Sequence, residues 1–405
     1  MKKQIHLREV TNNGAGYYGI LGVLGLIIAI GLGAAFYMEH NGHWVTGMNQ
    51  QIVWGTPHVF AVFLIVAASG ALNVASISSV FNKKLYKPLA PLSALLAIAL
   101  LVGGLMVLVL DLGRPDRLIV AMTHYNFKSI FAWNIILYNG FLAIVGIYIW
   151  LMLDPTKKAY SRYAGFAAFL WRLILTTGTG SIFGFLVARQ AYDAAIYAPM
   201  FIVMSFSFGL AIYILVLLAS MSWTGRPLGD VVLTRLKNLL GTFIAGVLLF
   251  VLAYHLTNLY ATEHHGWERF ILLDGGIYTS LFWIGQILLG SLVPLGLIFH
   301  PTLGKSRTAI AWAAGLVIIG GLAQMYTIII GGQAYPLVLF PGMEVRSSFS
   351  DGIVNAYSPS APEVLLGLSG MAIAMIAVAI GVKLLRFLPE DLSDAVADPH
   401  HGTGS

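Results

Sequence analysis

Residues 89–117 read LAPLSALLAIALLVGGLMVLVLDLGRPDR, a long uncharged run followed at once by two aspartates and two arginines. An apolar run of this length is enough to cross the hydrocarbon core of a bilayer as a helix. Gly113 and Pro115 favour the end of that helix, because glycine adopts helix-stop angles and proline cannot continue the hydrogen-bond ladder. The stretch therefore predicts a transmembrane helix with Asp111 and Arg114 on the same side of its end.

The whole chain is also rich in hydrophobic residues and poor in charged ones. Of its 405 residues, 58% are hydrophobic and 10% are charged, and the mean hydropathy is +0.82, whereas roughly a quarter of a soluble domain is charged. The net charge of +6 fits basic loops and implies no nucleic acid. Cysteine is absent, which excludes disulfides, cysteine-ligated clusters and Cys-x-x-Cys-His haem attachment. Electron chemistry would need an organic carrier, a histidine-ligated haem or a partner subunit.

Ten apolar runs predict an all-α integral membrane protein with about ten transmembrane helices. Residues 1–16 form a polar N-terminus, 17–388 a single membrane domain and 389–405 a tail predicted to be disordered. Residues 331–362 hold four prolines and are expected to form an ordered extracytoplasmic loop. The runs are 17–38, 57–80, 89–110, 130–153, 164–187, 200–221, 239–261, 277–298, 309–330 and 364–385.

Lysine and arginine are concentrated in one set of alternate loops, such as the one with Lys83, Lys84 and Lys87. Basic loops stay in the cytoplasm. This asymmetry predicts a cytoplasmic (inner) membrane location with both termini in the cytoplasm.

With that orientation, several polar residues reach one level near the outer surface. Ionisable groups in membrane helices are costly and usually face the bundle interior, so their convergence marks a candidate site. The residues at this level are His58, Asp111, Arg114, His124, Tyr125, Trp133, Asn134, Tyr254 and His255.

Simpler interpretations apply to single members of this set. His58 or His255 alone suits an interfacial residue with one hydrogen-bond partner, and the aromatic residues suit an interfacial belt. Arg172, two turns into its run, is expected to snorkel towards the cytoplasm. Asn73 and Ser76 suit interhelical hydrogen bonds, and with Arg172 they form a possible proton path.

Four segments carry a resemblance to a known family. They are LVLDLGRP (108–115), PHVF (57–60), NVAS (73–76) and MTHYNFKS (122–129). The first is similar to the best-known motif of the NrfD/PsrC family of membrane quinone-oxidoreductase subunits. Together they resemble more closely the DsrP-type subunits of the DsrMKJOP complex of dissimilatory sulfur metabolism.

The resemblance implies two four-helix bundles, about 57–187 and 200–330, with one extra helix at each end. It implies a quinone of menaquinone or ubiquinone type near the outer surface, and no metal, haem or iron–sulfur cluster of the chain's own. It also implies an extracytoplasmic ferredoxin-like iron–sulfur subunit. The DsrP-type resemblance adds a multihaem cytochrome c and further membrane and cytoplasmic redox subunits. Asp111 and Arg114 belong to the motif beside the quinone, and His58 is carried over with them.

The resulting hypothesis is electron exchange between a membrane quinone and an external iron–sulfur partner. His58 or His255 would exchange protons with the quinone, Asp111 would serve as proton reservoir, and Arg114 would orient Asp111 or a quinone oxygen. Two alternatives stay open. One is a secondary transporter, which predicts broken helices at the midplane of both halves. The other is a haem-b cytochrome ligated by His58 and His255.

Overall fold

The computed structural model describes residues 5–11, 14–337 and 352–397, and these hold ten helical segments long and apolar enough to cross a membrane. The predicted multi-pass all-α fold is confirmed. The longer elements are α1 (Ala15–Asn41), α2 (Thr56–Ala71) with α3 (Asn73–Ser79), α4 (Ala90–Leu110), α6 (Ile130–Leu153), α7 (Ser161–Gly184), α8 (Tyr197–Thr224), α9 (Asp230–Tyr260), α11 (Ile277–Ser280) with η7 (Leu281–Leu292) and α12 (Val293–Phe299), α13 (Arg307–Tyr326) with η9 (Thr327–Gly331) and α14 (Gly332–Ala334), and α15 (Ala361–Leu384).

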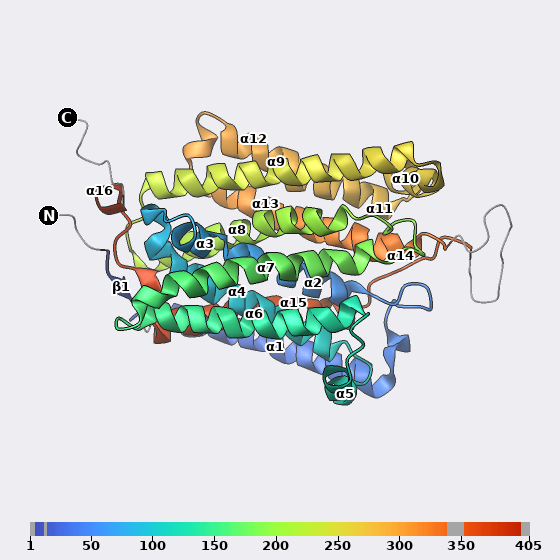
Figure 1. Ribbon diagram of the computed structural model, residues 1–405, viewed down its shortest axis with the longest axis horizontal. Coiled ribbons are helices and arrows are strands. Elements are labelled where there is room, and N and C mark those ends of the chain that lie inside the picture. Colours follow the sequence, from blue (N-terminus) through green and yellow to red (C-terminus); the bar gives the residue numbers. More distant parts are fainter. Residues whose placement is uncertain (1–4, 12–13, 338–351, 398–405) are drawn as a thin grey trace.

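Shorter elements lie at the two ends of the molecule. At the end opposite the termini are η1 (His43–Val45), η3 (Pro115–Arg117), α5 (Leu118–Thr123), η5 (Thr262–His264), α10 (His265–Arg269) and η6 (Phe270–Asp274). At the end that holds the termini are β1 (Leu7–Arg8), η2 (Lys84–Leu89), η4 (Lys158–Tyr160), η8 (Leu303–Lys305), β2 (Leu388–Pro389) and α16 (Asp394–Ala397). Figure 1 shows both termini at one end, as an even number of crossings requires.

We name two groups of spans by their order in the chain: the first group is α2 with α3, α4, α6 and α7, and the second group is α8, α9, η7 and α13. They meet where α8 packs against α2 and α7. The flanking helices α1 and α15 pack on each other, and α15 packs on α2 and α4. Both extra helices therefore cover the first group, and α1 leaves apolar residues such as Leu26 and Phe36 exposed, which suits contact with lipid.

Two glycines bring the groups into backbone contact. A Cβ added to Gly70 on α2 would lie 1.5 Å from the carbonyl oxygen of Ser205 on α8. A Cβ added to Gly209 on α8 would lie 2.1 Å from the backbone nitrogen of Ala71. Small residues allow such close approach of membrane helices. The position of α2 relative to α8 therefore depends on the absence of side chains at both residues.

The predicted disorder of the C-terminal tail is wrong for residues 389–397; residues 398–405 lie outside the described part of the chain. β2 pairs with β1, and both carboxylate oxygens of Asp394 accept backbone N–H groups at the start of α9. Leu388 and Leu392 are fully buried. These buried side chains and the capped helix order a segment whose local composition is polar.

Span nine and the following loop also differ from their predicted bounds. The helical segment continues through η9 and α14 to Ala334 rather than ending at Ile330. The Gln333 side chain is buried and accepts the N–H groups of Val53 and Trp54 at 2.9 and 3.0 Å, so the extra turn is tied to the chain before α2. Of the predicted extracytoplasmic loop, residues 338–351 lie outside the described part of the chain.

Candidate functional site

Asp111 lies at the C-terminal end of α4, with its carboxylate almost fully buried. Its Oδ2 is 2.9 Å from Nδ1 of His58, which is in the first turn of α2. That distance is typical of an ion pair, but the angles are not those of a hydrogen bond, and neither carboxylate oxygen has a hydrogen-bond partner among the described residues. Buried carboxylate oxygens are normally satisfied. Asp111 therefore keeps hydrogen-bonding capacity for a ligand.

A second histidine, His43 in η1, reaches the same aspartate. Its Nε2 donates to the backbone carbonyl of Asp111 at 3.1 Å and lies 3.9 Å from Oδ1. His43 was not among the predicted site residues, because the segment between the first two spans gives no periodic signal. The site thus has two imidazoles on one buried carboxylate.

Arg114 does not join this cluster in the described part of the chain. Its exposed guanidinium donates two hydrogen bonds to Asp116, from Nε at 3.2 Å and Nη2 at 3.3 Å. The physical reason is the following proline: Arg114 has φ −143°, and the residue before proline avoids the α region. The backbone leaves the helix before Arg114, so the expected contact with Asp111 is not made.

The four predicted residues around the next helix lie in three different environments. His124 is exposed and bonds Thr123, and Tyr125 is partly exposed beside Phe127. Trp133 is exposed and donates to the Phe127 carbonyl. Asn134 is buried and donates to the Gly178 carbonyl of α7 at 3.1 Å.

Other aromatic rings lie beside His58 instead. Trp54 stacks on His58 with ring centroids 6.3 Å apart, and the ring of Phe131 lies 6.0 Å from that of Trp54. Trp54 belongs to the WGTPH segment that contains His58, so the sequence itself indicates that Trp54 lies near His58. Phe131 comes from α6, and no sequence signal singles it out.

His255 belongs to a second and separate cluster. Its Nδ1 lies 2.7 Å from Oε2 of Glu268, which is completely buried, and Asn258 donates to Oε1 of Glu268 at 2.9 Å. Glu268 was missed because it follows α9 in a segment that has the composition of a loop. The chain turns back through η5, and α10 returns the carboxylate to α9.

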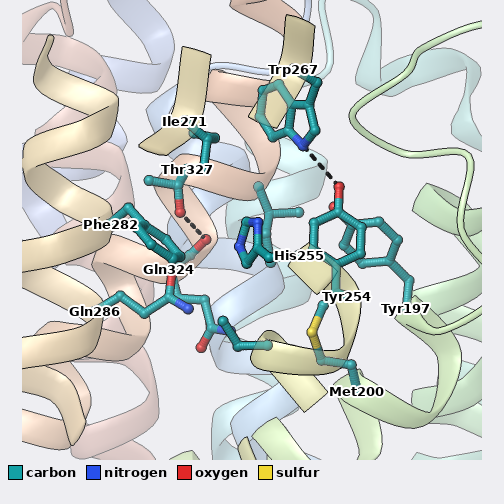
Figure 2. A pocket seen from close by; sticks show the side chains of 12 residues that line it. Tyr197, Met200, Tyr254, His255, Trp267, Ile271, Phe282, Gln286, Gln324 and Thr327 are labelled. Carbon is teal, nitrogen blue, oxygen red and sulfur yellow. Dashed lines mark hydrogen bonds between the residues drawn. The ribbon is translucent and has the colours of Figure 1, made fainter. Parts of the chain in front are cut away.

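Beside His255 is a small cavity of ≈ 30 Å³. Such a volume holds about two water molecules. Figure 2 shows His255, Gln286, Gln324 and Thr327 facing it, with Trp267 donating to the Tyr254 hydroxyl at 3.0 Å. Tyr254 in turn donates to the Ala191 carbonyl. In this conformation the cavity is too small for a quinone ring.

Aromatic side chains separate the two clusters. Between His58 and His255 the rings follow in the order Trp54, Phe183, Tyr197 and Tyr254, with neighbouring centroids 5.0–6.4 Å apart. His58 belongs to the first helix group and His255 to the second. His58 and His255, predicted at one level, therefore lie in two separate clusters, each with its own buried carboxylate.

Arg172 does not snorkel to the surface, so the preferred interpretation of this residue is wrong. It is buried, and its Nη1 donates to the Ser69 carbonyl at 3.1 Å and to the Asn73 side chain. These partners lie where α2 gives way to α3, which frees backbone carbonyls as acceptors. Ser76, the third member of the possible proton path, donates to the carbonyl of Leu72, the residue that precedes α3. The structure joins Arg172 to Asn73 but not to Ser76.

The chain matches the family model described as polysulphide reductase, NrfD, over residues 44–336. It is similar to an Hdr-like menaquinol oxidoreductase integral membrane subunit from Archaeoglobus fulgidus, with 27% identity over 97% of this chain and 99% of that protein. It is also similar to a subunit of selenate reductase from Mesobacillus selenatarsenatis, at 24% identity over 88% of this chain and 92% of the relative. A menaquinone reductase integral membrane subunit from Nitratidesulfovibrio vulgaris is 24% identical over 89% and 88% of the two chains.

Proposed function

Since the chain belongs to the NrfD polysulphide reductase family of membrane subunits, we propose that it exchanges electrons between a membrane quinone and a partner subunit at the Asp111–His58 cluster. The observation that carries this proposal is the buried Asp111 carboxylate, both of whose oxygens lack hydrogen bonds among the described residues beside a histidine. Trp54 and Phe131 supply aromatic surface next to it.

The chemistry requires proton exchange as well as electron exchange. A quinol that is oxidised releases two electrons and two protons, and its hydroxyl groups need acceptors within hydrogen-bond reach. His58 takes the first proton, which the Asp111 carboxylate beside it stabilises, and passes it to water before it takes the second, since its side chain is 23% exposed. The electrons leave to an iron–sulfur partner, because this chain has no thiolate to bind a cluster. Reduction of a quinone reverses each step.

The names of two relatives include menaquinol or menaquinone, which supports a menaquinone-type substrate. We place an extracytoplasmic ferredoxin-like subunit over α5, where Arg114, Asp116 and Arg117 are exposed. The motif similarity to DsrP-type subunits supports a complex of sulfur metabolism that includes a multihaem cytochrome c. Purification with partners attached tests this assignment, because the subunits can then be identified directly.

Photoaffinity labelling tests the quinone site in the intact complex. An azidoquinone is expected to label the peptides that contain His58 and residues 111–131, and excess menaquinone analogue should prevent the labelling. The matched peptide is the one that contains His255 and Glu268, which we expect to stay unlabelled. Competable label on that peptide alone would contradict the assignment.

The proposed orientation can be tested with single cysteines, since the chain has none of its own. In intact cells a membrane-impermeant maleimide is expected to react with cysteine at Asn41 or Thr262, and not at Lys84 or Lys305. All four positions are exposed, so burial cannot account for a difference. Labelling of the opposite pair would place the quinone site and the termini on the other sides of the membrane.

The two alternatives fit the geometry less well. His58 and His255 lie in different helix groups and each faces a carboxylate, so they are not arranged as axial ligands of one haem.

The other alternative is a secondary transporter. The helix break at Leu72 resembles that of a transporter, but the carbonyls near it accept hydrogen bonds from Arg172 and Ser93. The carbonyl oxygens of Ser69 and Ala71 are therefore already hydrogen-bonded within the protein and are not free to bind a substrate ion.

A further inference from the structure

A third buried carboxylate besides Asp111 and Glu268, Glu363, lies at the same end of the molecule, and the proposed reaction does not use it. It is in the first turn of α15 and is fully buried. Its Oε1 accepts the Tyr357 hydroxyl at 2.6 Å, and its Oε2 accepts the backbone N–H groups of Gly47 and Ser360 at 2.9 and 2.8 Å. Both oxygens are occupied, in contrast to those of Asp111, so Glu363 holds protein segments rather than a ligand.

The bond to Gly47 fixes the segment that carries His43. Only three residues separate His43 from Gly47, and the Nε2 atom of His43 lies 3.1 Å from the Asp111 carbonyl oxygen. A Cβ on Gly47 would lie 2.1 Å from the carbonyl oxygen of Ser358. This close fit leaves the segment little freedom while the bond to Glu363 is made.

The bond to Tyr357 fixes the segment that carries His58. The Tyr357 oxygen accepts the N–H of Thr56 at 2.7 Å and lies 2.9 Å from the Thr56 hydroxyl oxygen. Thr56 begins α2, two residues before His58. Burial and the hydrogen bond to Glu363 raise the pKa of Tyr357, so at neutral pH the phenol keeps the proton that it donates.

We propose that Glu363, directly and through Tyr357, positions His43 and His58 against Asp111; this inference rests on the function proposed above. One carboxylate holds both histidine-bearing segments, and the negative charge at the first turn of α15 is favoured by the helix dipole. Glu363 and Tyr357 are positioning residues in this scheme, because the carboxylate and the phenol are already bonded to each other and to the backbone. Their effect on the reaction passes through the two imidazoles.

The two branches can be separated by mutation. Tyr357→Phe removes the link to Thr56 and leaves the Glu363–Gly47 bond, whereas Glu363→Ala removes both. In the purified complex, the rate of modification by diethyl pyrocarbonate is measured for each histidine by mass spectrometry. Tyr357→Phe should raise the rate at His58 by about fivefold, as expected when a hydrogen bond of roughly 1 kcal/mol is lost. The rate at His43 should stay within twofold.

Glu363→Ala should raise the rates at both histidines, because both branches are lost. The matched control is Ser369→Ala on the same helix. Ser369 is buried and donates to Leu366 of α15 itself, so its loss should leave both rates unchanged. A general loosening of α15 would change the control as well.

Quinol oxidation gives a second readout. Tyr357→Phe is expected to lower kcat about fivefold and to leave KM within twofold, because the histidines serve proton transfer rather than binding of the ring. If the Glu363→Ala variant does not assemble into the complex, the Tyr357→Phe variant alone tests the positioning role.

Equal rates at His58 in Tyr357→Phe and the unaltered protein would overturn the positioning role, and so would an equal rise at both histidines. Histidine modification does not involve quinone, so its outcome is independent of the reaction. If Asp111→Asn left quinol oxidation unchanged, the proposed function would fail even where the selective rise at His58 is observed.

Discussion

Asp111→Asn is expected to lower quinol oxidation by the purified complex by a factor of about 100 or more, the range in which general acid–base groups contribute. The change keeps the size of the side chain and removes its charge. It leaves the neighbouring His58, 2.9 Å away, without the carboxylate that would stabilise its protonated form. The measurement is kcat/KM with a soluble menaquinol analogue, normalised to the amount of assembled complex.

Asp274→Asn provides the matched control for this prediction. Asp274 ends η6 at the same end of the molecule, is exposed, and is bonded to Arg269. Its loss should change turnover less than twofold, because exposed ion pairs contribute about 1 kcal/mol or less. If both variants kept full activity, the reaction would not depend on Asp111, and the site would have to lie elsewhere.

The sequence predicts the membrane helices well because the bilayer imposes their length and composition. All ten spans follow from apolar runs, and the motif after Leu110 correctly marks the end of α4. Asp111 and His58 lie at the end of α4 and the start of α2. The predicted topology places both of these helix ends at the same side of the membrane. These features need no knowledge of side-chain packing.

The missed features depend on contacts between distant segments. Glu268 and Glu363 stand outside the apolar runs and look like ordinary loop residues, yet both are completely buried. His43 reaches Asp111 from a segment outside the apolar runs, in which the Gly47 N–H is bonded to Glu363. Arg114 was instead predicted to join the site and does not. Its spacing suggested a pair with Asp111, but the extended backbone before Pro115 directs its side chain to Asp116. A helical spacing rule fails once the helix has ended.

The contact between α2 and α8 should be the most sensitive point of the fold. Gly70→Ala is expected to lower the free energy of unfolding by about 3 kcal/mol or more, at or above the usual range for overpacking. The new methyl group would meet the Ser205 carbonyl 1.5 Å away, and a backbone atom in a packed helix cannot move aside as a side chain can. The measurement is thermal or denaturant unfolding in detergent, followed by the yield of assembled complex.

The control is Gly146→Ala on α6, where an added Cβ has no atom within 4 Å among the described residues. Because alanine favours a helix by up to about 1 kcal/mol over glycine, this variant should unfold at the same temperature as the unaltered protein or at a slightly higher one.

Gly209→Ala adds a methyl group to the same α2–α8 contact from the side of α8. The double variant Gly70→Ala, Gly209→Ala should therefore lose less free energy of unfolding than the sum of the losses in the two single variants. The first methyl group already forces the helices apart and so makes room for the second. Full additivity would show that each glycine acts on a different neighbour, and unchanged unfolding of Gly70→Ala would show that the helices do not approach so closely.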